Sequence, residues 1–175
     1  MSIKSLIRTI PDYPKAGIQF RDITTLLKDP KGLQLLVDGL AEQYASRHIQ
    51  KIIGIEARGF VIGAAVAYKL GVGFVPIRKS GKLPGQTFRQ EYALEYGSDV
   101  MEIHQDAIED GERVLLMDDL IATGGTAIAA VSLIEQLGGK ISGCAFVIDL
   151  PDLGGMKRLQ NLGLQTFALC QFEGE

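Results

Sequence analysis

The chain has 175 residues, of which 46% are hydrophobic and 22% charged, a composition typical of one folded domain and not of a disordered or fibrous chain. No apolar run approaches the roughly 18 residues of a membrane span, and the N-terminus lacks a signal-peptide core, so we expect a cytoplasmic protein with no membrane partner. The net charge of −3 argues against a dedicated nucleic-acid binder.

The apolar pattern predicts strands that alternate with helices along most of the chain. Residues 1–30 are broken by Pro11, Pro14 and Gly17, and we expect them to form an extended flap. Beyond the flap, short apolar runs predict strands at residues 51–55, 73–77, 91–95, 101–104, 114–117, 141–148 and 165–169. Helical spacing predicts helices at residues 32–46, 59–70, 126–137 and 154–162.

This alternation predicts an α/β fold in a single domain over residues 1–175, with a mostly parallel central sheet flanked by helices on both faces. One stretch interrupts the pattern: residues 78–89 hold two Gly and one Pro and lead into a β-like pair. Flexible insertions of this kind in compact α/β domains are often lids. We therefore expect a flexible lid from Ser80 to Tyr92.

Residues 114–126 have the most specific pattern in the chain. Four apolar residues lead to Asp118 and Asp119, and a turn rich in Gly and Thr then opens the next helix. A buried strand would place both carboxylates at its carboxyl end, and the turn would offer N–H groups to an anion at a helix N-terminus. The pattern therefore suits a sugar phosphate. The plainer interpretation is a surface turn with an N-cap Thr and two solvated acids.

Charges are segregated along the chain. Residues 57–90 contain six Lys or Arg and no acid, whereas residues 91–119 contain ten acids and one Arg. We expect the basic stretch to hold a polyphosphate and the acidic stretch to handle hydroxyls, metal or a base. Part of this charge only solvates the surface, a role that we assign to Lys69, Glu102, Glu109, Asp110 and Glu112.

The thirteen residues 114–126 resemble the phosphoribosyl pyrophosphate (PRPP) signature of the type I phosphoribosyltransferase family. Neither a dinucleotide fingerprint nor a Walker loop is present in the sequence. Further segments resemble the adenine-specific members of that family, in order and over nearly the whole chain: Phe20-Arg21-Asp22-Ile23, Glu56-Ala57-Arg58-Gly59-Phe60, Arg78-Lys79-x-Gly-Lys82-Leu-Pro and Leu94-Glu95-Tyr96-Gly97. The resemblance implies the type I phosphoribosyltransferase fold, with an N-terminal hood at residues 1–30.

The resemblance also implies a role for each segment. The PRPP 5′-phosphate would bind Ala122, Thr123, Gly124, Gly125 and Thr126, and the ribose hydroxyls would bind Asp118 and Asp119. Pyrophosphate would bind Glu56, Ala57, Arg58, Arg78, Lys79 and Lys82, with a cis peptide bond between Glu56 and Ala57. Adenine would be read largely by main-chain groups at Gln19, Phe20 and Arg21, and Tyr92 would belong to the lid. Glu95 would be catalytic, exchanging a proton with N7 of the purine.

Plainer interpretations stay open for four of these segments. Arg58 would pair with Glu56, and the basic residues at 78–82 would form a solvated loop. Phe20 would belong to the core, and Glu95 would be an exposed strand residue.

The activity that the resemblance implies is a pentosyl transfer in purine salvage. The 5-phosphoribosyl group of PRPP would pass to adenine, giving AMP and pyrophosphate. Mg²⁺ would enter bound to PRPP, with no direct protein ligand and a contact through water to Asp118 or Asp119. An arginine that reaches a neighbouring subunit would imply a homodimer. Two alternatives remain: a sister transferase that uses hypoxanthine, guanine or xanthine, and a PRPP- or purine-sensing module without catalysis.

Overall fold

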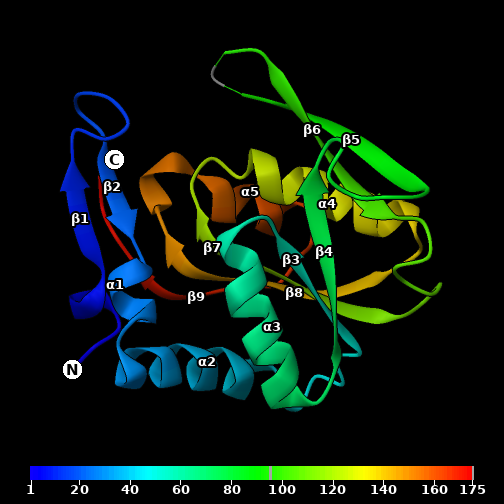
Figure 1. Cartoon of the computed structure of the whole chain (residues 1–175), viewed down its shortest axis with the longest axis horizontal. Coiled ribbons are helices and arrows are strands. Elements are labelled where there is room, and N and C mark those ends of the chain that lie inside the picture. Colours follow the sequence, from blue (N-terminus) through cyan, green and yellow to red (C-terminus); the bar gives the residue numbers. More distant parts are fainter. Residues whose placement is uncertain (95, 175) are drawn as a thin grey trace.

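The structure is a computed structural model that describes residues 1–94 and 96–174. Its centre is a seven-stranded sheet with the strand order β5-β6-β4-β3-β7-β8-β9 (Figure 1). Strands β4, β3, β7, β8 and β9 run parallel, whereas β6 is antiparallel to both β4 and β5 at one edge. The predicted α/β fold with a mostly parallel sheet is confirmed.

Each strand of this sheet corresponds to a predicted one. The bounds are β3 Lys51–Ile55, β4 Gly73–Lys79, β5 Thr87–Ala93, β6 Ser98–His104, β7 Arg113–Ile121, β8 Lys140–Asp149 and β9 Thr166–Gln171. Strands β3 and β8 are buried along nearly their whole length because helices cover both faces of the sheet, which is why they read as continuous apolar runs.

Helices α2 (Pro30–Tyr44) and α3 (Arg58–Leu70) cover one face, and α4 (Gly125–Gln136) and α5 (Gly155–Asn161) cover the other (Figure 1). Each pair buries its own cluster of apolar side chains. Successive strand residues point to opposite faces, so Leu115 joins the α2–α3 cluster and Leu116 joins the α4–α5 cluster. Within the residues described, no helix has the length and apolar character needed to cross a membrane.

Strand β7 is longer than predicted, which changes the setting of the two adjacent acids. The predicted strand ends at Met117, but β7 continues through Asp118 and Asp119 to Ile121. The apolar pair at its end lies beside β8, with Leu120 opposite Ile148. Strand β3 accompanies β7 only as far as Met117. Both acids therefore lie within a strand, on a stretch that is open on its β3 side.

Residues 1–30 contain more regular structure than the expected extended flap. Strands β1 (Arg8–Pro11) and β2 (Gln19–Asp22) form an antiparallel hairpin, which the short helix α1 (Thr24–Leu27) joins to α2. A 3-10 helix, Lys4–Leu6, precedes β1. The hairpin stands at one side of the molecule, across from the β5–β6 hairpin (Figure 1). We call residues 1–30 the hood.

The expected flexible lid from Ser80 to Tyr92 is only partly a loop. Residues 80–86 form turns and bends, but β5 begins at Thr87 and pairs with β6 along its whole length. The other face of β5 is held by α4, where the Ser132 hydroxyl donates to Gln90 Oε1 at 2.8 Å. The interval from Thr87 to Tyr92 is therefore part of the sheet.

Candidate active site

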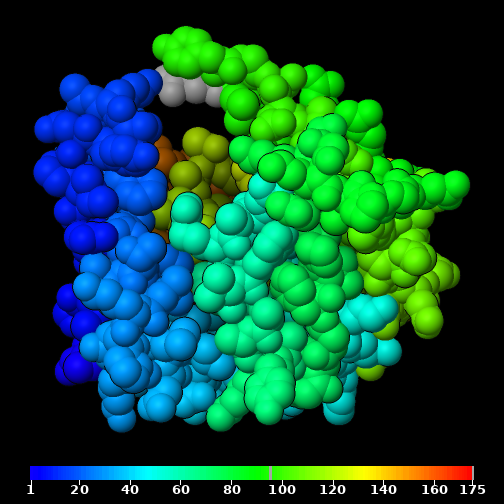
Figure 2. Space-filling model, in the orientation of Figure 1, coloured from blue at the N-terminus to red at the C-terminus, as the bar shows by residue number. Residues whose placement is uncertain are grey.

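Three neighbouring cavities open at the carboxyl edge of the parallel strands, where ligands bind in sheets of this type. Their volumes are about 640, 290 and 150 Å³, and we call them the hood cavity, the basic cavity and the loop cavity. Asp118 lines both the basic and the loop cavity, whereas Asp119 and Arg58 line both the basic and the hood cavity. Figure 2 shows the hollow between the blue hood and the green β5–β6 hairpin.

The loop cavity lies between β7 and the N-terminus of α4. All five residues predicted to bind the 5′-phosphate line it: Ala122, Thr123, Gly124, Gly125 and Thr126. Gly124 precedes α4 with φ +90°, a left-handed conformation that favours glycine. The exposed N–H groups of the first helical turn make this end of α4 suitable for an anion. Two parts of the plainer interpretation are wrong: the residue that precedes α4 is Gly124 and not a capping Thr, and Asp119 is not solvated but 8% exposed and paired with Arg58.

Helix α5 supports this loop from behind. The N–H of Gly155 donates to the Ala122 carbonyl at 3.0 Å, and Arg158 Nη1 donates to the Thr123 carbonyl at 2.8 Å. Sequence reasoning did not single out either residue. The glycine pair at 154–155, which opens the predicted helix, could have indicated this contact, because glycine lets the start of a helix approach a neighbouring backbone closely.

The basic cavity collects most of the predicted pyrophosphate ligands. Glu56, Ala57, Arg58, Arg78 and Lys79 line it, together with Tyr92 of the predicted lid. The peptide bond between Glu56 and Ala57 is cis, as the family resemblance implied. Lys82 lies on the exposed loop after β4, where its N–H donates to the Lys79 carbonyl at 3.2 Å.

The cations of this cavity are paired with acids. Arg58 Nε lies 2.5 Å from Asp119 Oδ2, so the alternative pairing of Arg58 with Glu56 is wrong. Glu56 instead accepts hydrogen bonds from Arg78 Nε at 3.0 Å and from the Lys79 N–H at 3.1 Å. Lys79 Nζ lies 3.6 Å from Asp99 Oδ2.

The two adjacent acids differ in their electrostatic setting. Burial, and then the neighbouring charge of Asp119, raise the pKa of Asp118 well above its ordinary value. The hydrogen bond from Arg58 to Asp119 raises the pKa of the guanidinium, against the effect of burial. Burial opposes ionisation of Glu56, but hydrogen bonds from Lys79 and Arg78 outweigh it and lower the pKa of that carboxyl. The site thus holds one acid whose pKa is raised beside one ion-paired carboxylate.

The hood cavity is lined on one side by residues 15–21 and on the other by apolar residues at the end of β7 and after β7 and β8. Gln19, Phe20 and Arg21, the predicted adenine ligands, all line it. Phe20 is half-buried and packs edge-on against Tyr13, with ring centroids 5.2 Å apart, so its assignment to the core is wrong. The apolar side comprises Leu120, Ala122, Leu150 and Leu153. Leu150 and Leu153 were missed, although they follow a predicted strand at its carboxyl end, where sites form.

The hood and the β5–β6 hairpin meet above these cavities. Lys15 Nζ of the hood lies 5.9 Å from the ring centroid of Tyr96 at the hairpin tip. Tyr92 turns its hydroxyl toward Asp99 Oδ2 at 3.4 Å, and burial raises the pKa of that phenol. Glu95, the predicted catalytic acid–base, lies outside the described residues.

Two of the five charges assigned to solvation, Glu102 and Glu112, bind protein partners instead, and Glu102 is buried. Glu102 is 7% exposed and accepts hydrogen bonds from the Gly81 N–H at 2.7 Å and the Thr87 hydroxyl at 2.5 Å. Glu112 pairs with Lys51 at 2.9 Å, and its side chain is 11% exposed. Each carboxylate binds donors from neighbouring segments of the chain. The sequence pattern around an acidic residue does not reveal such a role. Among residues 1–94 and 96–174, no group of three or more His, Cys, Asp or Glu side chains is arranged to hold a metal ion.

Comparison with known proteins agrees with this geometry. The phosphoribosyl transferase domain profile matches residues 23–163. The adenine phosphoribosyltransferase of Methylobacillus flagellatus is 68% identical over 99% of this chain and 98% of its own length. The crystal structure of adenine phosphoribosyltransferase from Thermoanaerobacter pseudethanolicus has a TM-score of 0.93 at 49% identity and covers 97% of this chain and 98% of its own. The Giardia lamblia enzyme, crystallised with 9-deazaadenine, has a TM-score of 0.93 at 36% identity and covers 98% of both chains.

Proposed function

The chain belongs to the phosphoribosyl transferase family, and we infer that it transfers the 5-phosphoribosyl group of PRPP to adenine, giving AMP and pyrophosphate. The observation that carries this assignment is the meeting of three unlike cavities at Asp118, Asp119 and Arg58. One cavity suits a phosphate, one a polyphosphate and one a flat apolar base. The reacting ribose carbon lies where they join.

The loop cavity receives the 5′-phosphate. The N-terminus of α4 and the N–H groups of residues 122–126 supply donors for the phosphate oxygens, with the helix dipole aligned to favour the anion. Because this phosphate does not react, its binding energy serves to orient the ribose carbon between the other two cavities.

The basic cavity receives pyrophosphate, the leaving group. Arg58, Arg78 and Lys79 are positioned to neutralise it, and Lys82 joins them from the adjoining loop, close enough to help lower the pKa of Glu56. Pyrophosphate replaces the acids as the partner of these cations. When pyrophosphate binds Arg58, Asp119 loses its ion-pair partner and becomes free to contact the ribose.

The two acids of β7 hold the ribose. Asp118 and Asp119 are placed to accept hydrogen bonds from the ribose hydroxyls. As the bond to pyrophosphate breaks, positive charge develops on the ribose, and the nearby carboxylates stabilise it electrostatically.

The hood cavity receives adenine. The main-chain groups of Gln19 to Arg21 present donors and acceptors to the edge of the base, while Phe20 and Leu150 offer apolar surface to its faces. Glu95 accepts the N7 proton as N9 attacks the ribose carbon. Substituting Gln for Glu95 should lower turnover far more than it weakens adenine binding; equal turnover in both proteins would remove this role.

Magnesium is the cofactor that fits this site. Mg²⁺ favours one or two carboxylates combined with substrate phosphates and water, and the two adjacent acids of β7 beside the basic cavity provide that setting. When bound to PRPP, the ion neutralises charge on the departing pyrophosphate.

We also assign the chain to a cytoplasmic homodimer. Helix α3 leaves an apolar surface exposed, with Val61 at 53% and Tyr68 at 90%, and this helix begins at Arg58 in the site. A second copy covering α3 would lie against the basic cavity, where an arginine can serve both sites. The free thiols Cys144 and Cys170 suit a reducing compartment.

The test is a panel of bases incubated with the protein, PRPP and Mg²⁺, with nucleotide formation followed by chromatography. AMP from adenine, with no nucleotide from hypoxanthine, guanine or xanthine, is the expected result. A guanine or hypoxanthine product indicates the sister transferase, and PRPP binding without any product indicates a sensing module.

A further inference from the structure

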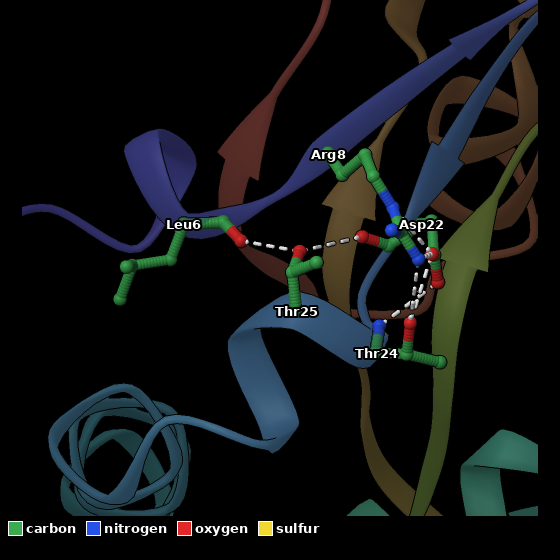
Figure 3. Close-up of polar contacts among 5 residues, drawn as sticks. All are labelled: Leu6, Arg8, Asp22, Thr24 and Thr25. Atoms are coloured by element: carbon green, nitrogen blue, oxygen red, sulfur yellow. Dashed lines mark hydrogen bonds and ion pairs between the residues drawn. The ribbon is translucent and has the colours of Figure 1, made fainter.

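Asp22 is a buried acid to which no step of the reaction assigns a role. It is the last residue of β2 and is 7% exposed. Its carboxylate accepts four hydrogen bonds, from Arg8 Nε at 3.1 Å, Arg8 Nη2 at 2.5 Å, the Thr24 N–H at 2.9 Å and the Thr24 hydroxyl at 2.8 Å (Figure 3). One side chain therefore joins the start of β1, the end of β2 and the start of α1.

A second tie lies beside it at the base of the hood. The Thr25 hydroxyl donates to the Leu6 carbonyl at 2.7 Å, which links α1 to the residue that leads into β1 (Figure 3). Helix α1 is itself anchored in the core, because Ile23 and Leu26 are 1% and 0% exposed. The hood hairpin is thus fastened to a rigid part of the molecule at its base, while residues 11–17 at its far end are exposed.

The angle at which the hood hairpin leaves this anchored region controls the position of the residues that we assign to adenine. Gln19 lies three residues before Asp22, which is about 10 Å along a strand. A tilt of about 10° at Asp22 would then move Gln19 by about 1.7 Å, because displacement grows with distance from the pivot. Hydrogen bonds to a base hold only within a few tenths of an ångström of 2.9 Å, so a movement of this size breaks them.

We propose that Asp22, held by Arg8 and Thr24, is the positioning residue that sets the hood angle and thereby the affinity and selectivity for the base. This rests on the proposed function, in which the hood reads adenine. Two further observations agree with it. Burial opposes ionisation, but hydrogen bonds from Arg8 and Thr24 outweigh it and lower the pKa of Asp22 to about 2, so these bonds persist at neutral pH. The charge of Asp22 also contributes to the raised pKa of Arg58 at the edge of the hood cavity.

The experiment compares Asp22→Asn, Arg8→Gln and Arg8→Lys with the unaltered protein in steady-state kinetics. We expect KM for adenine to rise about 10-fold or more in Asp22→Asn and Arg8→Gln, from the displacement above, with KM for PRPP changed less than about 2-fold. Arg8→Lys retains one charged donor and should recover part of the adenine affinity. Activity with hypoxanthine relative to adenine should rise in the first two variants.

Glu112→Gln is the matched control. It too removes the charge of an ion-paired carboxylate whose side chain is little exposed, at 11%, but Glu112 lies just before β7, at the amino-terminal edge of the parallel strands. A merely structural role for Asp22 predicts that both variants lose stability and keep the same KM for adenine, and this result would overturn the proposal. Should Asp22→Asn fail to fold, Thr24→Val, which removes a single donor, takes its place with the same expectation. If the unaltered protein forms no AMP, the proposed function fails; if it does and the variants match it, only this inference fails.

Discussion

Replacing Gly155 with Ala would place a methyl group behind the loop that we assign to the 5′-phosphate. Gly155 is the first residue of α5, and its N–H donates to the Ala122 carbonyl. A Cβ atom on Gly155 would lie 2.5 Å from that carbonyl oxygen and 2.8 Å from the backbone nitrogen of Gly124. Both neighbours are main-chain atoms, so the new methyl group can be accommodated only if the loop moves.

The size of that movement follows from contact distances. The Ala122 oxygen has to retreat by about 0.9 Å, from 2.5 Å to an ordinary contact of 3.4 Å. Overpacking of this kind costs about 1–3 kcal/mol of folding stability. A displacement near 1 Å in groups that orient a substrate costs up to about 100-fold in rate. We therefore expect kcat/KM for PRPP to fall about 10- to 100-fold in Gly155→Ala.

The assay is initial-rate AMP formation with varied PRPP at saturating adenine, combined with urea unfolding of each protein. Gly163→Ala serves as the control because Gly163 has φ +83° and a Cβ there would meet nothing within 4 Å. Its left-handed backbone costs about 1–2 kcal/mol without touching the loop. If Gly155→Ala keeps the kcat/KM for PRPP of Gly163→Ala, the loop does not position the 5′-phosphate.

Three further results are expected. Glu102→Ala leaves the Gly81 N–H and the Thr87 hydroxyl without their acceptor, so the free energy of unfolding, measured in urea, should fall by about 2–4 kcal/mol. A loss below about 0.5 kcal/mol would show that water replaces the carboxylate. Tyr68→Asp puts a charge on the exposed face of α3 and should yield monomers in sedimentation analysis; an unchanged dimer would place the interface elsewhere. Asp22, with a pKa of about 2 when folded against an ordinary 3.8, stabilises the fold above pH 3.8 and loses this contribution as the pH falls toward 2. Acid should therefore destabilise Asp22→Asn less than the unaltered protein over that interval, and identical acid profiles would contradict the ion pair.

The parts of the fold that sequence predicts well are those in which local pattern and tertiary setting agree. Strand β3 has the predicted bounds, Lys51–Ile55, because a short apolar run between polar residues suits a strand buried on both faces. The loop at 122–126 is likewise specified locally, since glycine and threonine at a strand-to-helix junction leave few other conformations. The conformation of the loop that lines the loop cavity was predictable for this reason.

The parts that sequence does not predict depend on partners far along the chain. Strand β1 is mostly exposed, so it has no alternating apolar face, and its pairing with β2 follows from tertiary contacts. The extension of β7 through Asp118 and Asp119 was missed because acids are unfavourable in a strand unless a neighbour such as β8 pairs them. Arg58 pairs with Asp119, which is distant in sequence, and not with its sequence neighbour Glu56. This pairing depends on how the strands are arranged at the sheet edge, which the local pattern around Arg58 does not reveal.

Sheet topology also explains why bases and acids are segregated along the chain. Parallel strands end at one edge, so β3 and β4, which lead into basic segments, and β7, which carries the acids, deliver opposite charges to one place. There Arg58 pairs with Asp119 and Arg78 pairs with Glu56, which offsets the repulsion among neighbouring cations in the free protein. In the proposed reaction, a pyrophosphate that binds Arg58 would free Asp119 for the ribose. Binding of the leaving group would thus prepare the carboxylate that we propose stabilises the developing charge, and we expect loss of Arg58 to impair ribose contacts as well as pyrophosphate affinity.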